Sequence, residues 1–128
     1  MLSLRNGAAV SRALSSDIDP ELRALIARRV EELAGYGAED IGELVHFLVV
    51  EPGDTIEAIE AELGFSPLVN FVNGARFGDP GFTPSWELAE RRGSWFELVF
   101  VLSDDGFGWV VLVAEAAELA STLEIYCG

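Results

Sequence analysis

The clearest hydrophobic pattern of the chain lies in residues 96–113, FELVFVLSDDGFGWVVLV. Two apolar runs flank a short polar segment, and Glu97 is the only charged residue within the runs. A strand with one solvated face alternates apolar and polar side chains, whereas these runs are apolar at almost every position. The pattern therefore predicts a β-hairpin, with strands over 95–102 and 107–113, whose two faces are both buried.

The turn of this hairpin determines which residues face each other across the two strands. A three-residue loop, Asp104-Asp105-Gly106 with Gly106 in a left-handed conformation, pairs Leu102 with Gly108. A two-residue turn formed by Asp105 and Gly106 shifts the pairing by one residue. Either register leaves two apolar faces, so the prediction of double burial does not depend on the turn.

Two further segments before residue 51 have strong patterns. Asp19 followed by Pro20 is typical of a helix start, and Gly35 is typical of a helix end. The apolar stretch 44–50, LVHFLVV, is followed by Pro52 and is rich in β-branched residues. We predict a helix from Pro20 to Gly35 and a buried strand over 44–50.

Two amphipathic helices are predicted after this strand. Asp54 as the cap with Glu57 three residues later forms a variant of the capping box, and Gly64 ends that helix. The last helix is predicted from apolar residues at helical spacing: Ala116, Leu119, Ala120 and Leu123.

The segment between these two helices is rich in turn residues. Asn73-Gly74 predicts a hairpin turn with short arms. Thr83-Pro84 predicts the start of a brief helix that continues to about Arg91, and Gly93 ends it.

Together these elements predict one α+β domain over residues 19–128. Its sheet is antiparallel or mixed, has four to five strands with the hairpin 95–102/107–113 at its centre, and is packed by amphipathic helices. Residues 1–18 are predicted to be an N-terminal arm, either loose or a short helix on the domain. Their Arg and Ser content, without an acid in the first sixteen residues, leaves an organellar targeting segment as the alternative.

The two apolar faces of the hairpin can be covered in two ways. Either helices cover both faces, or helices cover one face and a second copy of the chain covers the other. Each buried Val, Leu or Phe contributes roughly 1.5 to 3 kcal/mol, so neither face is expected to stay exposed. Because the predicted helices are few and two are short, we favour the second arrangement and predict a homodimer.

The distribution of charge is more informative than its sum. The formal net charge is −14, and all eight basic residues are Arg. Between Arg29 and Arg76 there are ten acidic residues and no basic one. Such a field repels phosphate, which argues against direct nucleic-acid binding, and attracts a basic protein surface. The acids that we expect to bind a partner are Glu43, Glu51, Asp54, Glu57, Glu60 and Glu62. The alternative is that these acids serve solubility alone.

Residues that commonly carry chemistry are few. His46 is the single histidine and lies among apolar strand residues, where a structural role is expected. Cys127 is the single cysteine, which excludes an internal disulfide and favours a reducing, cytoplasmic location. Asp104 and Asp105 are explained by the turn before a cation site is needed. We find no catalytic constellation and expect neither a metal nor a cofactor.

A second candidate site combines aromatic and Arg residues in the C-terminal half. The residues that would line such a ligand-binding groove are Arg76, Trp86, Arg91, Arg92, Trp95 and Trp109. The alternative, which we favour, is that this aromatic group belongs to the protein core.

From these patterns we expect a non-catalytic cytoplasmic protein that binds a basic macromolecule through its acidic segment. One specific form is an inhibitor whose acidic surface imitates nucleic acid or neutralises a basic enzyme. The alternatives are a small-ligand binder or enzyme using the groove around residues 76–109, and a structural subunit that docks a different chain. No apolar stretch reaches the roughly 20 residues that span a bilayer, so no membrane partner is expected.

Overall fold

The structure is a computed structural model and describes residues 1–127. In this part of the chain one five-stranded sheet has the order β1-β2-β5-β4-β3. The strands are β1 (Leu2–Leu4), β2 (Val45–Val50), β3 (Leu88–Arg92), β4 (Trp95–Val101) and β5 (Gly108–Ala114). The β2–β5 pair is parallel and the other pairs are antiparallel. The predicted single-domain α+β fold with a mixed sheet is confirmed.

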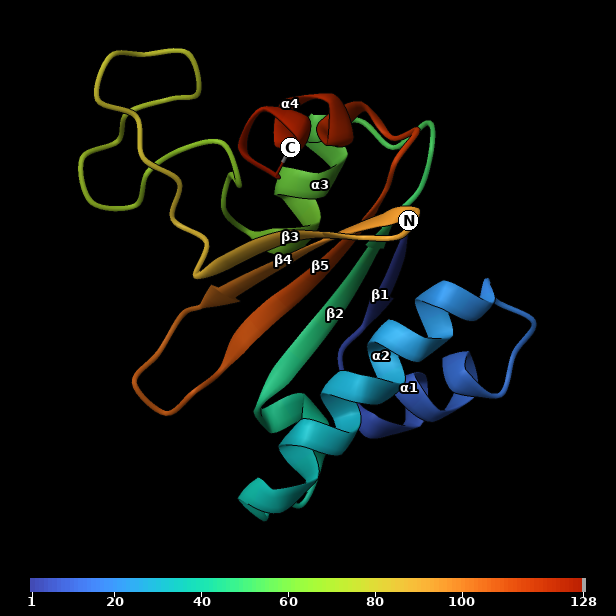
Figure 1. Cartoon of the computed structure of the whole chain (residues 1–128). Helices are drawn as coiled ribbons and strands as arrows, with labels where there is room; N and C mark the ends of the chain where they lie inside the picture. The colour runs from blue at the N-terminus through green and yellow to red at the C-terminus, as the bar shows by residue number, and fades with distance from the viewer. Residues whose placement is uncertain (128) are drawn as a thin grey trace.

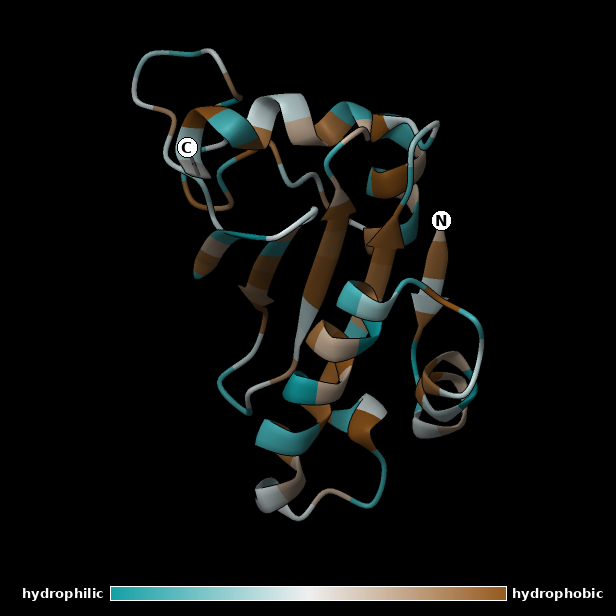
Figure 2. Cartoon of the chain, turned by 45° about the vertical axis from the view of Figure 1, so that its right-hand side comes forward, coloured by the Kyte–Doolittle hydropathy of each residue, from teal (hydrophilic) through white to brown (hydrophobic). Residues whose placement is uncertain are grey.

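Helices cover both faces of this sheet (Figure 1). The first layer consists of α1 (Gly7–Leu14) and α2 (Pro20–Leu33), and the second of α3 (Ile56–Leu63) and α4 (Glu118–Cys127). The central strands between the layers are strongly hydrophobic, and the helices carry both polar and apolar residues (Figure 2). Each face of the sheet therefore has its own apolar core.

The prediction that the hairpin is buried on both faces is confirmed for most of its length. Leu98 lies under the second layer and Leu112 under the first, and both side chains are 0% exposed. The reasoning that the helices can cover only one face was wrong, because the N-terminal segment supplies an additional helix. A second copy of the chain is not needed to bury the sheet, and the homodimer remains a prediction from sequence.

Both predicted registers of the hairpin were wrong, because its loop is wider than expected. Val101 pairs with Gly108, and the Leu102 N–H donates to the Phe107 carbonyl at 2.9 Å. The loop therefore covers 103–106, where Gly106 is left-handed as predicted (φ 88°). A Cβ on Gly108 would collide with the carbonyl of Phe100, so glycine suits this register.

The first eighteen residues belong to the sheet and to its first layer, whereas the sequence pattern set them apart as an arm. Leu4 of β1 and Val10 of α1 are each 3% exposed and lie in the core. The Asn6 side chain caps α1 by accepting the Ala9 N–H at 2.8 Å. Half of the residues in this segment are apolar, but β1 and α1 are both short, and tertiary contacts decide their structure.

The predicted helix that starts at Thr83-Pro84 does not form. Residues 83–87 contain no helix or strand, and β3 occupies Leu88–Arg92. β3 pairs with β4 through a two-residue turn at Gly93-Ser94, in which Gly93 has a φ of 64°. Pairing with β4 outweighs the helix-like composition of LAERR.

The Asn73-Gly74 hairpin is reduced to a turn with a single bridge between Val69 and Arg76. Gly74 is left-handed, with a φ of 71°. Instead of a strand ladder, the Asn70 side chain holds the loop by accepting a backbone N–H from Val72 at 2.9 Å.

The predicted helix boundaries are close to those observed. Asp19 caps α2 and accepts the Leu22 N–H at 3.1 Å, as predicted. The cap of α3 is Thr55 and not Asp54, whose carboxylate instead accepts the Glu51 N–H at 2.8 Å. None of the helices in the described residues has the length and apolar character needed to cross a membrane.

Candidate functional site

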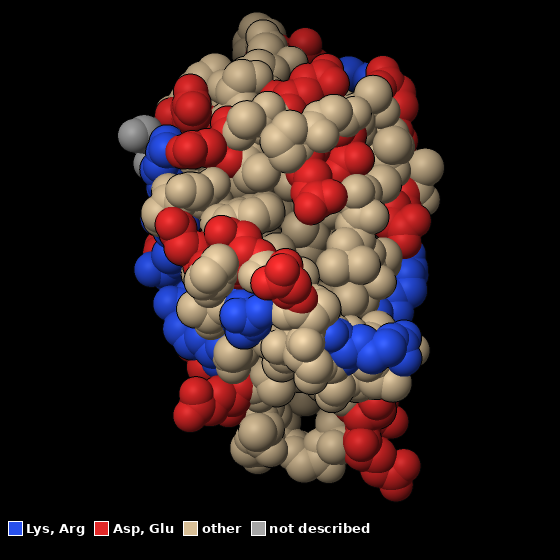
Figure 3. Space-filling view, turned by 90° about the vertical axis from the view of Figure 1, so that its right-hand side faces the viewer, with Lys and Arg blue, Asp and Glu red and all other residues tan. Residues whose placement is uncertain are grey.

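Five of the six acids expected to bind a partner lie in two consecutive segments, a turn and a helix. We call the set Glu51, Asp54, Glu57, Glu60 and Glu62 the acidic surface. These residues lie in the turn after β2 and on α3. Acidic side chains predominate in the upper part of the face seen in Figure 3, whereas basic side chains form a band below. Glu43 lies at the other end of β2, about 20 Å from Glu51 along a six-residue strand. Glu62 lies between these two ends, because it pairs with Arg5, whose carbonyl is beside Gly42.

Only two positive groups compensate the acidic surface within the described residues. The N-terminal amine lies 3.6 Å from Glu51 and 3.1 Å from Asp54, and Arg5 lies 3.0 Å from Glu62. Glu57 and Glu60 take part in no ion pair among these residues. The acidic surface therefore keeps an excess of negative charge.

Local hydrogen bonds keep two of these carboxylates ionised. Burial raises the pKa of Asp54, but the Glu51 N–H and the N-terminal amine lower it further than burial raises it. The hydrogen bond from Arg5 lowers the pKa of Glu62, with a further contribution from Ser3. Both groups carry their charge at neutral pH.

The two helical layers differ in the sign of their charges. Neither α3 nor α4 contains a basic residue, whereas the first layer contains Arg12, Arg23, Arg28 and Arg29. The excess of negative charge is therefore concentrated on the second layer.

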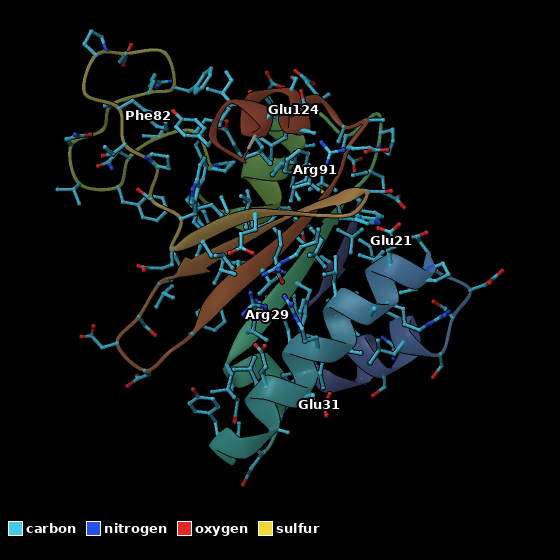
Figure 4. The ribbon with its side chains drawn as sticks, in the orientation of Figure 1. Glu21, Arg29, Glu31, Phe82, Arg91 and Glu124 are labelled. Carbon is cyan, nitrogen blue, oxygen red and sulfur yellow. The ribbon has the colours of Figure 1, made fainter. Side chains whose placement is uncertain are left out.

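A buried ion cluster joins the first layer to the sheet. Glu97 of β4 is 0% exposed, and its carboxylate oxygens lie 3.0 Å from Arg28 and 2.9 Å from Arg29 of α2. Arg92 of β3 lies 3.4 Å away. Figure 4 shows Arg29 between α2 and the strands, with Glu31 on the outer side of the helix.

Three guanidinium groups outweigh the cost of burying this carboxylate. Burial raises the pKa of Glu97, but the hydrogen bond and charge of Arg29, together with the charges of Arg28 and Arg92, lower it overall. Residues of α2, β3 and β4 meet here, so the cluster has a structural role. Sequence reasoning gave Glu97 no role, although its position as the only charge within an apolar strand was the signal.

We expect the free energy of unfolding to fall as the pH is lowered from about 5 to about 3. The folded chain holds the pKa values of Glu97, Asp54 and Glu62 below their usual range. A carboxylate with a lowered folded-state pKa stabilises the fold above its usual pKa, and this contribution is lost as the pH falls through the lowered value. Urea unfolding followed by circular dichroism at several pH values measures the effect.

The variant Glu97→Gln removes one of these three groups. Its free energy of unfolding should depend less on pH over the same range than that of the unmodified chain. An identical pH dependence in the two proteins would contradict the claim that ionisation of Glu97 stabilises the folded chain.

The six residues of the predicted aromatic groove are not brought together. Trp95 lies under the first layer, and its indole N–H donates to Asp19 at 2.9 Å. Trp109 is on the opposite face of the sheet, where the guanidinium of Arg5 lies 4.9 Å from its ring. Trp86 is partly buried against the second layer, with its ring 5.5 Å from that of Tyr126.

The three Arg residues of the predicted groove are also separated. Arg91 pairs with Glu115 at 2.6 Å and lies over the ring of Phe96, towards α4 (Figure 4). Arg92 belongs to the Glu97 cluster, whereas Arg76 is exposed in the loop after α3. Because these three Arg residues lie apart, they cannot bind one ligand together.

The structure contains an apolar cleft elsewhere, between α2 and the β4–β5 hairpin. Its volume is about 170 Å³, and its lining includes Leu33, Val99 and Val101, with Arg29 and Glu32 as charged residues. Pockets for drug-sized ligands are typically about 300 to 1,000 Å³. The cleft is therefore smaller than a typical ligand pocket.

His46 is held in an aromatic environment. Its ring lies 4.9 Å from that of Phe107 and 5.1 Å from that of Trp109, and its Nδ1 is buried without a hydrogen-bond partner among the described residues. Burial lowers the pKa of His46, and the charge of Arg5 lowers it further. The imidazole is therefore neutral at pH 7.

Neither a metal site nor Cys127 adds a candidate functional site. No group of three or more His, Cys, Asp or Glu side chains within the described residues is arranged to hold a metal ion. The side chain of Cys127 lies outside the described part of the structure.

Comparison of the chain with protein-family models, with curated proteins and with solved structures found no match in any of the three.

Proposed function

We propose that this chain is a non-catalytic, cytoplasmic binding protein whose acidic surface binds a basic macromolecular partner. The observation that carries the proposal is the placement of five acids on the turn after β2 and on α3. Among residues 1–127, only Arg5 and the N-terminal amine form ion pairs with them. A specific form of it is an inhibitor that occupies the nucleic-acid site of a basic protein.

The fold itself does not require this arrangement of charge. Glu57 and Glu60 are three residues apart on α3, and like charges at this spacing destabilise a helix by a few tenths of a kcal/mol. The buried side chains of α3, Ile59 and Leu63, would attach the helix equally well with neutral residues on its outer side. Glu57 also lies in the first turn of α3, where the helix dipole favours an acid, and Glu60 accepts the Ser66 hydroxyl at 3.2 Å. The helix therefore carries this pair at little net cost.

The alternative proposal, a small-ligand site around residues 76–109, has less support. The residues proposed for it lie on both faces of the sheet and in an exposed loop. A homodimer is not part of our proposal, and light scattering at micromolar concentration tests it separately.

We expect the double variant Glu57→Gln/Glu60→Gln to bind a basic probe roughly fivefold more weakly at low salt. The probe is an octa-arginine peptide, and titration calorimetry in about 20 mM salt measures its affinity. Because exposed charges are screened, affinity should fall steeply between about 20 and 250 mM salt. Glutamine keeps the size of the side chain and its carbonyl acceptor, so the variant tests charge alone.

A matched control removes the same amount of charge elsewhere. Asp104→Asn/Asp105→Asn changes two exposed acids at the tip of the β4–β5 hairpin, far from α3 (Figure 1). This control should bind the probe nearly as well as the unmodified chain. Equal weakening by the two double variants would show that the probe responds to total charge and not to the acidic surface.

A further inference from the structure

The two edges of the sheet differ in how well they are protected against pairing with another strand. Exposed strand edges usually carry charged residues or proline, which prevent unwanted pairing. β3, at one edge, carries Glu90, Arg91 and Arg92. β1, at the other edge, has the sequence Leu2-Ser3-Leu4, without a charge or a proline. The β1 edge is therefore chemically open to an additional strand.

A groove runs along this open edge. It lies between β1 and α1 and has a volume of about 290 Å³. The α1 residues that line it include Ala9 and Ala13, whose small side chains leave the space beside the strand free. Because β1 pairs with β2 on one side only, part of its backbone N–H and C=O groups lies on the unpaired side of the strand.

Arg12 gives the groove a specific charge. Its side chain is exposed on the groove wall and makes no ion pair or hydrogen bond within residues 1–127. In a chain with a net charge of −14, a cation without a carboxylate partner is available to an external acid. Guanidinium groups bind carboxylates through paired hydrogen bonds.

We propose that this groove binds an extended peptide segment, which adds to β1 as a further strand and places a carboxylate on Arg12. Backbone hydrogen bonds to the strand edge would supply affinity, and apolar side chains in the groove together with the Arg12 contact would supply selectivity. This groove adjoins the acidic surface at Ser3, which also contributes to the lowered pKa of Glu62. Its ligand carries an acid and not a basic surface, so the proposal stands independently of the proposed function.

A short peptide fits this edge better than a second copy of the chain. β1 has three residues, which allows only a few inter-strand hydrogen bonds. Stable interfaces between folded proteins usually bury about 1,600 Å² in total, well beyond what a three-residue edge offers.

The test uses two synthetic probes, the blocked peptides acetyl-VTVTVE-amide and acetyl-VTVTVQ-amide, titrated into the ¹⁵N-labelled full chain. Amide shifts should be confined to β1, α1 and their neighbours. Arg12→Gln should weaken binding of the Glu peptide roughly tenfold and leave binding of the Gln peptide unchanged. The control Arg76→Gln removes another exposed Arg that has no ion pair in the described residues, and it should change neither affinity.

A second pair of variants tests the groove itself. Ala9→Phe fills the space beside β1 and should abolish binding of both peptides, whereas Ser11→Phe, at an exposed position of α1 that does not line the groove, should not. Thermal unfolding shows that each variant is folded. The proposal is overturned if neither peptide binds at millimolar concentration, if Arg12→Gln weakens both peptides equally, or if the chain self-associates through this edge.

Discussion

Glu97→Gln should lower the free energy of unfolding by about 3 kcal/mol, the largest effect that we expect from one polar substitution in this chain. The carboxylate is 0% exposed and lies within hydrogen-bond distance of Arg28 and Arg29. Removing its charge leaves Arg28, Arg29 and Arg92 close together without the anion that compensates them. Because these guanidinium groups are partly exposed, water limits the loss to the lower part of the range for buried ion pairs.

Urea unfolding followed by circular dichroism measures this loss, with Glu90→Gln as the control. Glu90 is also an acid of this region and pairs with Arg92, but its side chain is 43% exposed. An exposed pair contributes less than about 1 kcal/mol, so the control should be nearly as stable as the unmodified protein. Equal losses in the two variants would contradict a special role for the buried carboxylate.

Leu98→Ala and Leu112→Ala should each lower the free energy of unfolding by about 3 kcal/mol. The two side chains lie on opposite faces of the sheet, and both are 0% exposed within a single chain. Each substitution removes buried apolar contacts and leaves a cavity under one helical layer.

Chemical denaturation at several protein concentrations checks this prediction. If each layer covers its face within one chain, both losses should be large at every concentration. A loss near zero for either variant, or one that disappears on dilution, would show that the corresponding face is not covered as described.

The parts of the fold that the sequence predicts are those with a strong hydrophobic period. The stretch 44–50, the hairpin strands and α2 were predicted because apolar spacing and helix caps agree there. β3 was predicted as a helix, since LAERR lacks apolar alternation and becomes a strand only by pairing with β4. β1 and α1 are short, and their structure depends on contacts with β2 and α2.

Only part of the candidate site could be predicted from the sequence. The acidic surface could be predicted because its residues lie close together in the sequence, in one turn and one helix. Glu43, also near in sequence, is separated from Glu51 and Asp54 by the length of β2. In the Glu97 cluster, Arg28 and Arg29 precede Glu97 by 69 and 68 positions in the sequence. No local sequence pattern indicates a contact over such a separation.

The most direct measurement of the central claim is a comparison of what binds the chain in its native cell. The unmodified chain, Glu57→Gln/Glu60→Gln and Asp104→Asn/Asp105→Asn are each used to retain partners, which are then eluted with increasing salt and identified. We predict that a protein with a basic surface is retained by the unmodified chain and by the hairpin variant, is lost from the α3 variant, and elutes at moderate salt. Retention of the same partner by all three proteins, or elution that does not depend on salt, would contradict binding through the acidic surface.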